Sequence, residues 1–328
     1  MLRNLRFVLV CFAGLLILCS CAERPPNHLK GKVIVLDPGH GGTAAIDTYR
    51  VGPTGEREEW INLRVALELR DVLEEKGASV LMTRTTDSAV NLQDRALLAV
   101  QNQADVFVSV HHNATADSSV NFPIIYFHGN ASENRASVAL GKHLAQSLIK
   151  TMYHGNAPVS LVSDHTIFPA AGTAVLRYSY GIPAVIAEAS FFTNPGEEQR
   201  LKDESYNLQE ANAYVEALES FFGEALEPIE EKYSHGQVEP FRVFQEAERM
   251  NPVARNWRQD YENGKALLEA HQIDTAYQLL TRSARSFPDS WVAGDAHRLR
   301  AEALDKMDST SAAAMARKRV DEFYVTLP

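Results

Sequence analysis

The chain has 328 residues, of which 45% are apolar and 23% charged, and its formal net charge is −10. This length exceeds that of a typical single domain, so two domains are expected, and the composition is that of a globular protein. The negative charge argues against a nucleic-acid partner and against electrostatic attraction to an anionic surface.

Residues 1–20 have the pattern of an export signal. Arg3 and Arg6 precede an uncharged apolar run at 7–18, which is too short to span a bilayer comfortably. Cys21 is the last cysteine of the chain. An exported domain without later cysteines has no disulfide framework, so any metal must be held by histidine and carboxylate side chains.

The segment Leu18-Cys19-Ser20-Cys21 resembles the cleavage box of bacterial lipoproteins. This implies an exported protein of the cell envelope or periplasm, attached to a membrane by a lipid on Cys21. Ala22 after the cysteine fits sorting to the outer membrane if the source is Gram-negative. Cys19 departs from the small residue usual at its position, and the alternative is a plain signal peptide cleaved near Ala22. Residues 21–30 would then form a polar tether.

Residues 31–223 alternate short apolar runs with helical periodicity, which is typical of an α/β domain. Strand-like runs occur at residues 33–36, 79–82, 106–110, 123–127, 174–176 and 184–187. Helical patterns occur between them, at residues 60–76, 92–102 and 137–152, and a long one ends near 222. Because strands and helices follow one another, we expect right-handed crossovers and a mostly parallel, twisted sheet flanked by helices.

Three strand-like runs end on side chains that can bind a metal or move a proton. The first run breaks into Asp-Pro-Gly and presents His40, the run at 106–110 continues into His111, and the run at 184–187 ends on Glu188. Ligands of open α/β sheets gather at the carboxyl ends of the strands. These three positions therefore indicate a metal site.

Six motifs follow one another over roughly residues 31–223. They are LDPGHGG (36–42), an acidic residue opening a helix before Asn62-Leu63, LMTRTTD (81–87), Leu92 with Arg95, ADVFVSVHHNA (104–114) and IPAVIAEASFFTN (182–194). Each motif alone is weak. In this order they resemble the zinc-dependent N-acetylmuramoyl-L-alanine amidases of the family often called amidase type 3.

The resemblance implies a Zn²⁺ ion held by His40, Glu58 and His111, with a fourth position left for water. Glu59 is the alternative to Glu58, because the helix dipole by itself favours carboxylates in an opening helical turn. Glu188 is assigned a catalytic role rather than a ligand role. It would take a proton from the attacking water and return it to the leaving amine.

The neighbours of these residues carry weaker signals. Adjacent strand residues point to opposite faces, so His112 is expected to pack or to support the site rather than bind metal. Asp37 and Asn113 are expected to orient ligands through hydrogen bonds. Arg84 and Arg95 match the family, but buried salt bridges explain them equally well.

The stretch between Asn113 and Pro183 is long enough for a short lid over the site, and residues 154–168 are the candidate. His128 and His165 have no spacing that demands a metal. They could contact substrate only if loops bring them to the rim of the site.

The pattern changes at 224–240, a polar connector, and residues 241–328 are predicted to be helical. One stretch fits the residue spacing of a tetratricopeptide helix pair, at Gly264, Leu267, Ala276, Leu280 and Pro288. A weaker match to the same spacing follows at Ala301, Leu304 and Ala313. The alternative is a generic helical hairpin. One or two such units are too few for independent stability, so this region should pack on the first domain or on a protein partner.

The function implied by the resemblance is hydrolysis of peptidoglycan at the amide between N-acetylmuramic acid and the L-alanine of the stem peptide. One alternative is a zinc peptidase that acts on the stem peptide. The other is a non-catalytic scaffold lipoprotein that binds the cell wall and recruits partners through its helical domain. Since all four site positions are filled, the sequence speaks against the scaffold.

Overall fold

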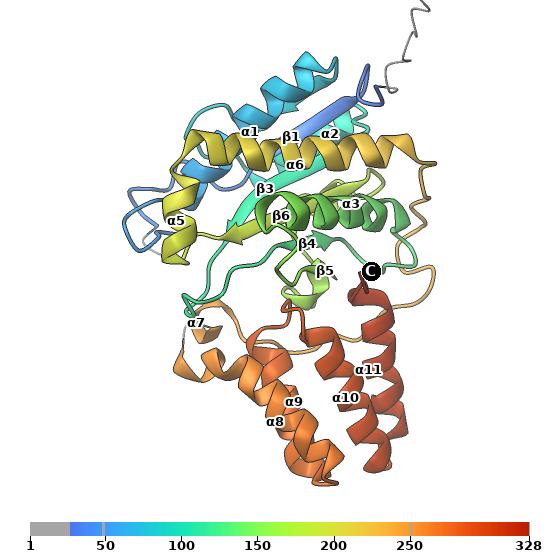
Figure 1. Cartoon of the computed structure of the whole chain (residues 1–328). Coiled ribbons are helices and arrows are strands. Elements are labelled where there is room, and N and C mark those ends of the chain that lie inside the picture. Colours follow the sequence, from blue (N-terminus) through green and yellow to red (C-terminus); the bar gives the residue numbers. More distant parts are fainter. Residues whose placement is uncertain (1–26, 48–49, 250, 328) are drawn as a thin grey trace, which may run out of the picture.

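The computed structural model describes residues 27–47, 50–249 and 251–327, which fold around one six-stranded sheet (Figure 1). The strands are ordered β2-β1-β3-β6-β4-β5. Their bounds are β1 Val33–Pro38, β2 Ser79–Met82, β3 Val106–Asn113, β4 Ile124–Phe127, β5 Ser160–Ser163 and β6 Ala184–Phe191. All neighbours are parallel except β4 and β6, which are antiparallel. The expectation of a mostly parallel sheet is confirmed.

Helices cover both faces of the sheet, because alternate strand residues bury apolar side chains on each side. One face carries α1 (Glu58–Glu75), α3 (Arg135–Met152) and α6 (Glu204–Gly223), which share a buried apolar cluster with the strands. The other face carries α2 (Leu92–Gln101), α4 (Ala174–Tyr178) and the C-terminal helices. A short helix, α5 (Pro195–Leu201), follows β6.

Two local predictions differ from the structure. The run at 174–176 forms helix α4 rather than a strand, and strand β5 was not predicted. A three-residue apolar run fits a buried helical turn as well as a strand. Strand β5 has the sequence Ser-Leu-Val-Ser, whose two apolar residues carry too little pattern for detection.

The C-terminal region contains only helices among its described residues, as expected. They are α7 (Glu246–Arg249), α8 (Trp257–Glu269), α9 (Ile273–Ser286), α10 (Ala293–Lys306) and α11 (Thr310–Phe323), with a 3₁₀ turn at Pro252–Asn256. Helices α8 and α9 approach closely at Gly264, where a Cβ atom would lie 2.8 Å from the Leu280 side chain. This close approach is what a tetratricopeptide-like pair requires at its small residue, and the repeat assignment stays a prediction.

The helical region lies against the α/β part rather than apart from it (Figure 1). Phe122 and Phe191 of the α/β part share a buried cluster with Trp257 and Phe287 of the helical region. After α11 the chain pairs with the edge strand β5, where the Val325 N–H donates to the Leu161 carbonyl at 2.9 Å.

The segments flanking the α/β part are also docked onto it. Leu29, within the expected tether, is fully buried, because its apolar side chain joins the core cluster. In the connector at 224–240, the Glu230 N–H donates to the Glu133 carbonyl at 2.7 Å.

The expected export signal at 1–20 and the expected lipid anchor on Cys21 lie outside the described residues. Within the part that is described, no helix combines the length and apolar character needed to cross a bilayer.

Candidate metal centre

The first candidate ligand, His40, lies in a tight turn after β1. Its φ angle is +59°, in the left-handed region that non-glycine residues rarely adopt. Gly39 precedes it, and a Cβ atom there would lie 2.2 Å from the ring of His111. The Pro-Gly-His sequence therefore lets the two imidazoles approach, with ring centroids 4.9 Å apart.

Two buried arginines hold this turn by its carbonyl oxygens. Arg84 donates to the carbonyls of Pro38 and Gly39, each at 2.8 Å. Arg95 donates to the carbonyls of Pro38 at 2.9 Å and of His40 at 2.6 Å. These contacts fix the backbone of the turn and offset the cost of the left-handed residue.

Arg95 also forms a buried ion pair with Asp37 at 2.7 Å. Thr83 and Ser109 donate hydroxyl hydrogen bonds to the same carboxylate, each at 2.6 Å. Burial alone would raise the pKa of Asp37, but Arg95 and the two hydroxyls outweigh it and lower the pKa. Arg95 therefore forms the buried salt bridge considered in the sequence analysis, and it also positions the turn, a role that was not predicted.

Three candidate ligands converge on one point. Glu58 is the first residue of α1, and its Oε1 lies 3.1 Å from His40 Nε2 and 2.9 Å from His111 Nδ1. Burial would raise the pKa of Glu58, but the two imidazoles hold it well below its usual value. The ligand atoms of all three residues lie within 4.8 Å of one another.

This donor set fits a divalent cation of the zinc type. Ligands at about 2.0–2.1 Å from a tetrahedral zinc ion stand roughly 3.3 Å apart, close to the separations around Glu58 Oε1. Two imidazoles with one carboxylate are also a common ligand set of hydrolytic zinc sites, which keep one position open for water.

A chain of hydrogen bonds supports Glu58 from inside the protein. Asn62, one turn further along α1, donates to Glu58 Oε1 at 3.2 Å and to the Gly39 carbonyl at 3.3 Å. Its own carbonyl oxygen lies 2.8 Å from His112 Nδ1, and His112 Nε2 lies 3.0 Å from Glu210 Oε2. His112 therefore supports the site through its contact with Asn62. Such support was one of the two roles expected for it. In the sequence Asn62 was named only as part of a motif, and Glu210 was not singled out.

Two other candidates lie nearby without joining the cluster. Glu59 is buried, but its Oε1 accepts from Arg57 Nε at 2.6 Å, so this carboxylate is directed to the arginine. The Asn113 side chain accepts from the next backbone N–H, that of Ala114, at 2.8 Å. Its predicted role in orienting a ligand is not seen in the structure, because a local turn takes up its oxygen.

Glu188 lies on β6 directly opposite His111 of β3 in the strand register. Its Oε2 is buried without a hydrogen-bond partner among the described residues. Burial raises the pKa of Glu188 to about 8, with His111 opposing the shift and Glu58 adding to it. Asp289 of the helical region also raises this pKa, while Arg249 lowers it.

Two of the three candidate ligands, His40 and His111, line a cavity of about 560 Å³. Arg50 and Arg177 also lie on its wall. Within the candidate lid at 154–168, residues 160–163 form strand β5, which pairs with β4, and residues 164–166 form a 3₁₀ turn. Of this segment only Phe168 lines the cavity.

His128 and His165 lie elsewhere in the fold. They follow β4 and β5, which run antiparallel to β6. The two histidines therefore lie at the opposite end of the strands from Glu188. His128 Nδ1 lies 2.9 Å from Asp164, and Lys232 Nζ lies 2.6 Å from His128 Nε2. The ligand atoms of His128, Asp164 and His165 also lie within 4.8 Å of one another, and Lys232 contacts the ring nitrogen of His128 that does not contact Asp164.

Fold and cluster together define an α/β protein with a candidate metal centre at the carboxyl ends of the strands of a mostly parallel sheet. Residues 34–220 match the family described as N-acetylmuramoyl-L-alanine amidase, and the chain belongs to this family. The family match ends before the C-terminal helical region begins.

Individual relatives agree with this assignment. The chain is 31% identical over 203 residues to the probable cell wall amidase LytH of Staphylococcus epidermidis, a match covering 60% of each protein. It is 30% identical over 225 residues to the N-acetylmuramoyl-L-alanine amidase AmiA of Escherichia coli, covering 58% of this chain and 76% of AmiA. The crystal structure of an N-acetylmuramoyl-L-alanine amidase from Clostridium difficile 630 aligns with a TM-score of 0.51 at 28% identity. That alignment covers 59% of this chain and 98% of the solved one.

Proposed function

We propose that the protein is a zinc-dependent N-acetylmuramoyl-L-alanine amidase. It would cleave peptidoglycan at the amide between the lactyl group of N-acetylmuramic acid and the L-alanine of the stem peptide. The observation that carries this proposal is the convergence of His40, Glu58 and His111 on one point. Family membership and the similarity to the probable cell wall amidase LytH support the substrate.

A zinc ion bound there would supply Lewis acidity, which activates water and stabilises charge on the carbonyl oxygen. Glu188 would take a proton from the attacking water and give it to the leaving amine. Its support for this role is its place opposite His111, its unpartnered buried oxygen and its raised pKa of about 8. A pKa near neutrality suits a carboxyl that serves first as base and then as acid.

The test is digestion of purified peptidoglycan followed by mass analysis of the products. The proposal expects intact stem peptides and glycans with free lactyl carboxylates, loss of activity with a chelator, and recovery with Zn²⁺. Shortened peptides would instead identify a zinc peptidase. A folded protein that binds no zinc and releases nothing would favour the scaffold lipoprotein.

Neighbouring carboxylates provide matched variants. Glu58→Gln should lose zinc, whereas Glu59→Gln should keep it, because Glu59 is directed to Arg57. Glu188→Gln should keep zinc and lose hydrolysis. Activity of Glu188→Gln equal to that of the native protein would remove the proposed proton-transfer role.

We also propose that the protein is exported to the cell envelope and held there by a lipid on Cys21. Similarity to the probable cell wall amidase LytH supports an extracytoplasmic site of action. Mass spectrometry of the N-terminal peptide should find acyl chains on Cys21, and Cys21→Ser should release the protein from membranes. Cys19→Ser is the matched control and should stay attached. The proposed protein partner of the helical domain can be sought with this membrane-attached form.

A further inference from the structure

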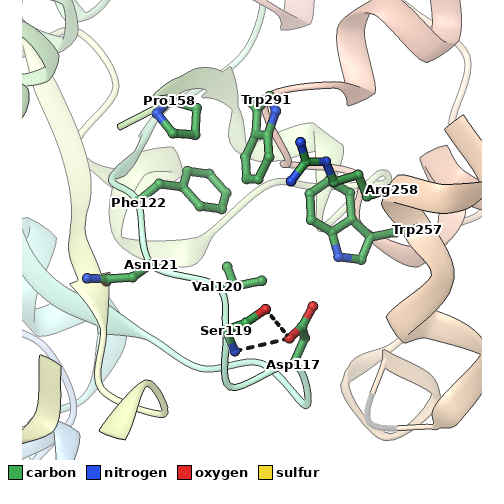
Figure 2. Close-up of a pocket in the computed structure, with 9 residues that line it drawn as sticks. All are labelled: Asp117, Ser119, Val120, Asn121, Phe122, Pro158, Trp257, Arg258 and Trp291. Carbon is green, nitrogen blue, oxygen red and sulfur yellow. Dashed lines mark hydrogen bonds between the residues drawn. The ribbon is translucent and has the colours of Figure 1, made fainter. Parts of the chain in front are cut away.

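A second cavity lies between the β3–β4 connection and the helical region (Figure 2). Its volume is about 380 Å³, within the range of small-molecule sites, and it shares no lining residue with the cavity at the metal centre. The residues that carry its chemistry are Asp117, Ser119, Phe122, Trp257, Arg258 and Trp291.

The walls of this aromatic cavity are fixed by packing between the two parts of the chain. The Trp291 ring meets Phe122 edge-on at 4.6 Å and Trp257 edge-on at 4.9 Å between ring centroids. Phe122 is 1% exposed and Trp257 3% exposed, so neither ring can turn freely. The cavity is therefore formed before any ligand arrives, which lowers the entropic cost of binding.

Its lining carries one cation and one anion. Arg258 is exposed, forms no ion pair within the described part of the chain, and lies 5.8 Å from the centre of the Trp291 ring. Asp117 uses one carboxylate oxygen, Oδ1, to accept from the Ser119 N–H at 3.1 Å and hydroxyl at 2.6 Å (Figure 2). Its other oxygen, Oδ2, makes no hydrogen bond or ion pair with the described residues and can accept from a ligand.

A third polar group is buried without a partner. The indole N–H of Trp257 has no acceptor among the described residues, although a buried donor normally finds one. This N–H is inaccessible to solvent, so the polar chemistry of the cavity comes from Arg258 and Asp117, which lie between its aromatic walls.

We propose that this aromatic cavity binds the zwitterionic end of an amino acid, with an ammonium and a carboxylate on one carbon. Arg258 takes the carboxylate, and Asp117 takes the ammonium. The indole rings add cation–π attraction for the ammonium and exclude water. A saccharide would leave both charges without a counter-charge, so the lining favours the zwitterion.

The identification of the molecule that carries this zwitterionic end rests on the proposed function. A stem peptide whose third residue is a diamino dicarboxylic acid presents such a zwitterionic end away from the bond that is cut. The aromatic cavity would then hold one part of the peptide while the amide lies at the metal centre, and the helical region would contribute to substrate choice.

Tryptophan fluorescence gives a direct measurement, because the chain has three tryptophans and two of them line the cavity. In the full-length protein carrying Trp60→Phe, both remaining fluorophores report on the cavity. Titration with meso-diaminopimelate should give a saturable change. Derivatives acetylated at both amino groups, or amidated at both carboxylates, have no intact zwitterionic end and should bind at least tenfold more weakly.

Arg258→Gln and Asp117→Asn should each raise Kd for meso-diaminopimelate at least tenfold. Arg255→Gln is the matched control, since Arg255 is exposed nearby and does not line the cavity, and its Kd should be unchanged. Because Arg258 and Arg255 are both exposed, neither substitution should disturb folding, which the melting temperature checks.

Equal binding of native protein and the Arg258→Gln variant would overturn the proposal, as would equal affinity for the blocked derivatives. A response to N-acetylglucosamine oligomers that ignores both charge variants would identify a saccharide site instead. The titration is done on chelator-treated protein, so the binding measurement does not depend on hydrolysis. Failure of peptidoglycan cleavage would refute the amidase and leave the binding result intact.

Discussion

Replacing Arg95 with methionine tests how the turn that carries His40 is held. Arg95 and Asp37 are 4% and 1% exposed, and removing one partner of a buried ion pair costs about 3–5 kcal/mol. Thr83 and Ser109 still donate to Asp37 in the variant, so we expect the lower end, about 3 kcal/mol. For a domain of this size that lowers Tm by roughly 6–12 °C.

The same variant should bind zinc more weakly. Arg95 also donates to the carbonyls of Pro38 and His40, and losing such support for a ligand typically costs about 10–100-fold in metal affinity. The double variant Arg95→Met with Asp37→Asn removes the unpaired buried charge. It should recover part of the stability and none of the zinc affinity.

The assays are thermal unfolding of the metal-free protein and competition for zinc with a fluorescent chelator. Arg317→Met is the control, because its ion pair with Asp305 is exposed and worth about 0–1 kcal/mol. If the double variant regains full zinc affinity, Arg95 acts through its charge alone and the positioning argument is wrong.

Three further outcomes follow from the same site. Gly39→Ala should abolish zinc binding, since its Cβ would meet the His111 ring at 2.2 Å, whereas Gly196→Ala, with its nearest neighbour at 3.4 Å, should bind normally. Asn62→Leu removes the amide that donates to the proposed carboxylate ligand, and zinc titration should show affinity about 10–100-fold lower. The pKa of Asp37 is lowered in the folded protein, so its stabilising effect is present above the unfolded value of about 3.9 and lost as pH falls through the folded value. Chemical unfolding at a series of pH values should therefore show a shallower acid loss of stability in Asp37→Asn.

The strands that carry the site could be predicted because each is a buried apolar run ending on a polar residue. His40, His111 and Glu188 all lie at such ends, and the structure brings the two histidines together with Glu58. Glu58 could not be separated from Glu59 by pattern, since both open the same helix. The structure distinguishes them, because Arg57 donates a hydrogen bond to the carboxylate of Glu59.

Other parts of the site depend on contacts between distant segments. Glu210 reaches His112 from 98 residues further along the chain, and nothing in the local pattern of α6 marks it. The only available signal was His112 itself, a buried histidine that needs polar partners. The aromatic cavity escaped prediction for the same reason, because Phe122 and Trp291 meet only when the helical region docks.

The pairing of the chain after α11 with strand β5 bears on how the protein avoids self-association. β5 is the last strand of the sheet, and an open edge exposes amide donors and acceptors that recruit strands from other molecules. Val325 occupies part of that edge through its bond to Leu161. A fragment ending near residue 223 would uncover both this edge and the aromatic face around Phe122, and we expect it to form oligomers or precipitate where the full chain stays dispersed.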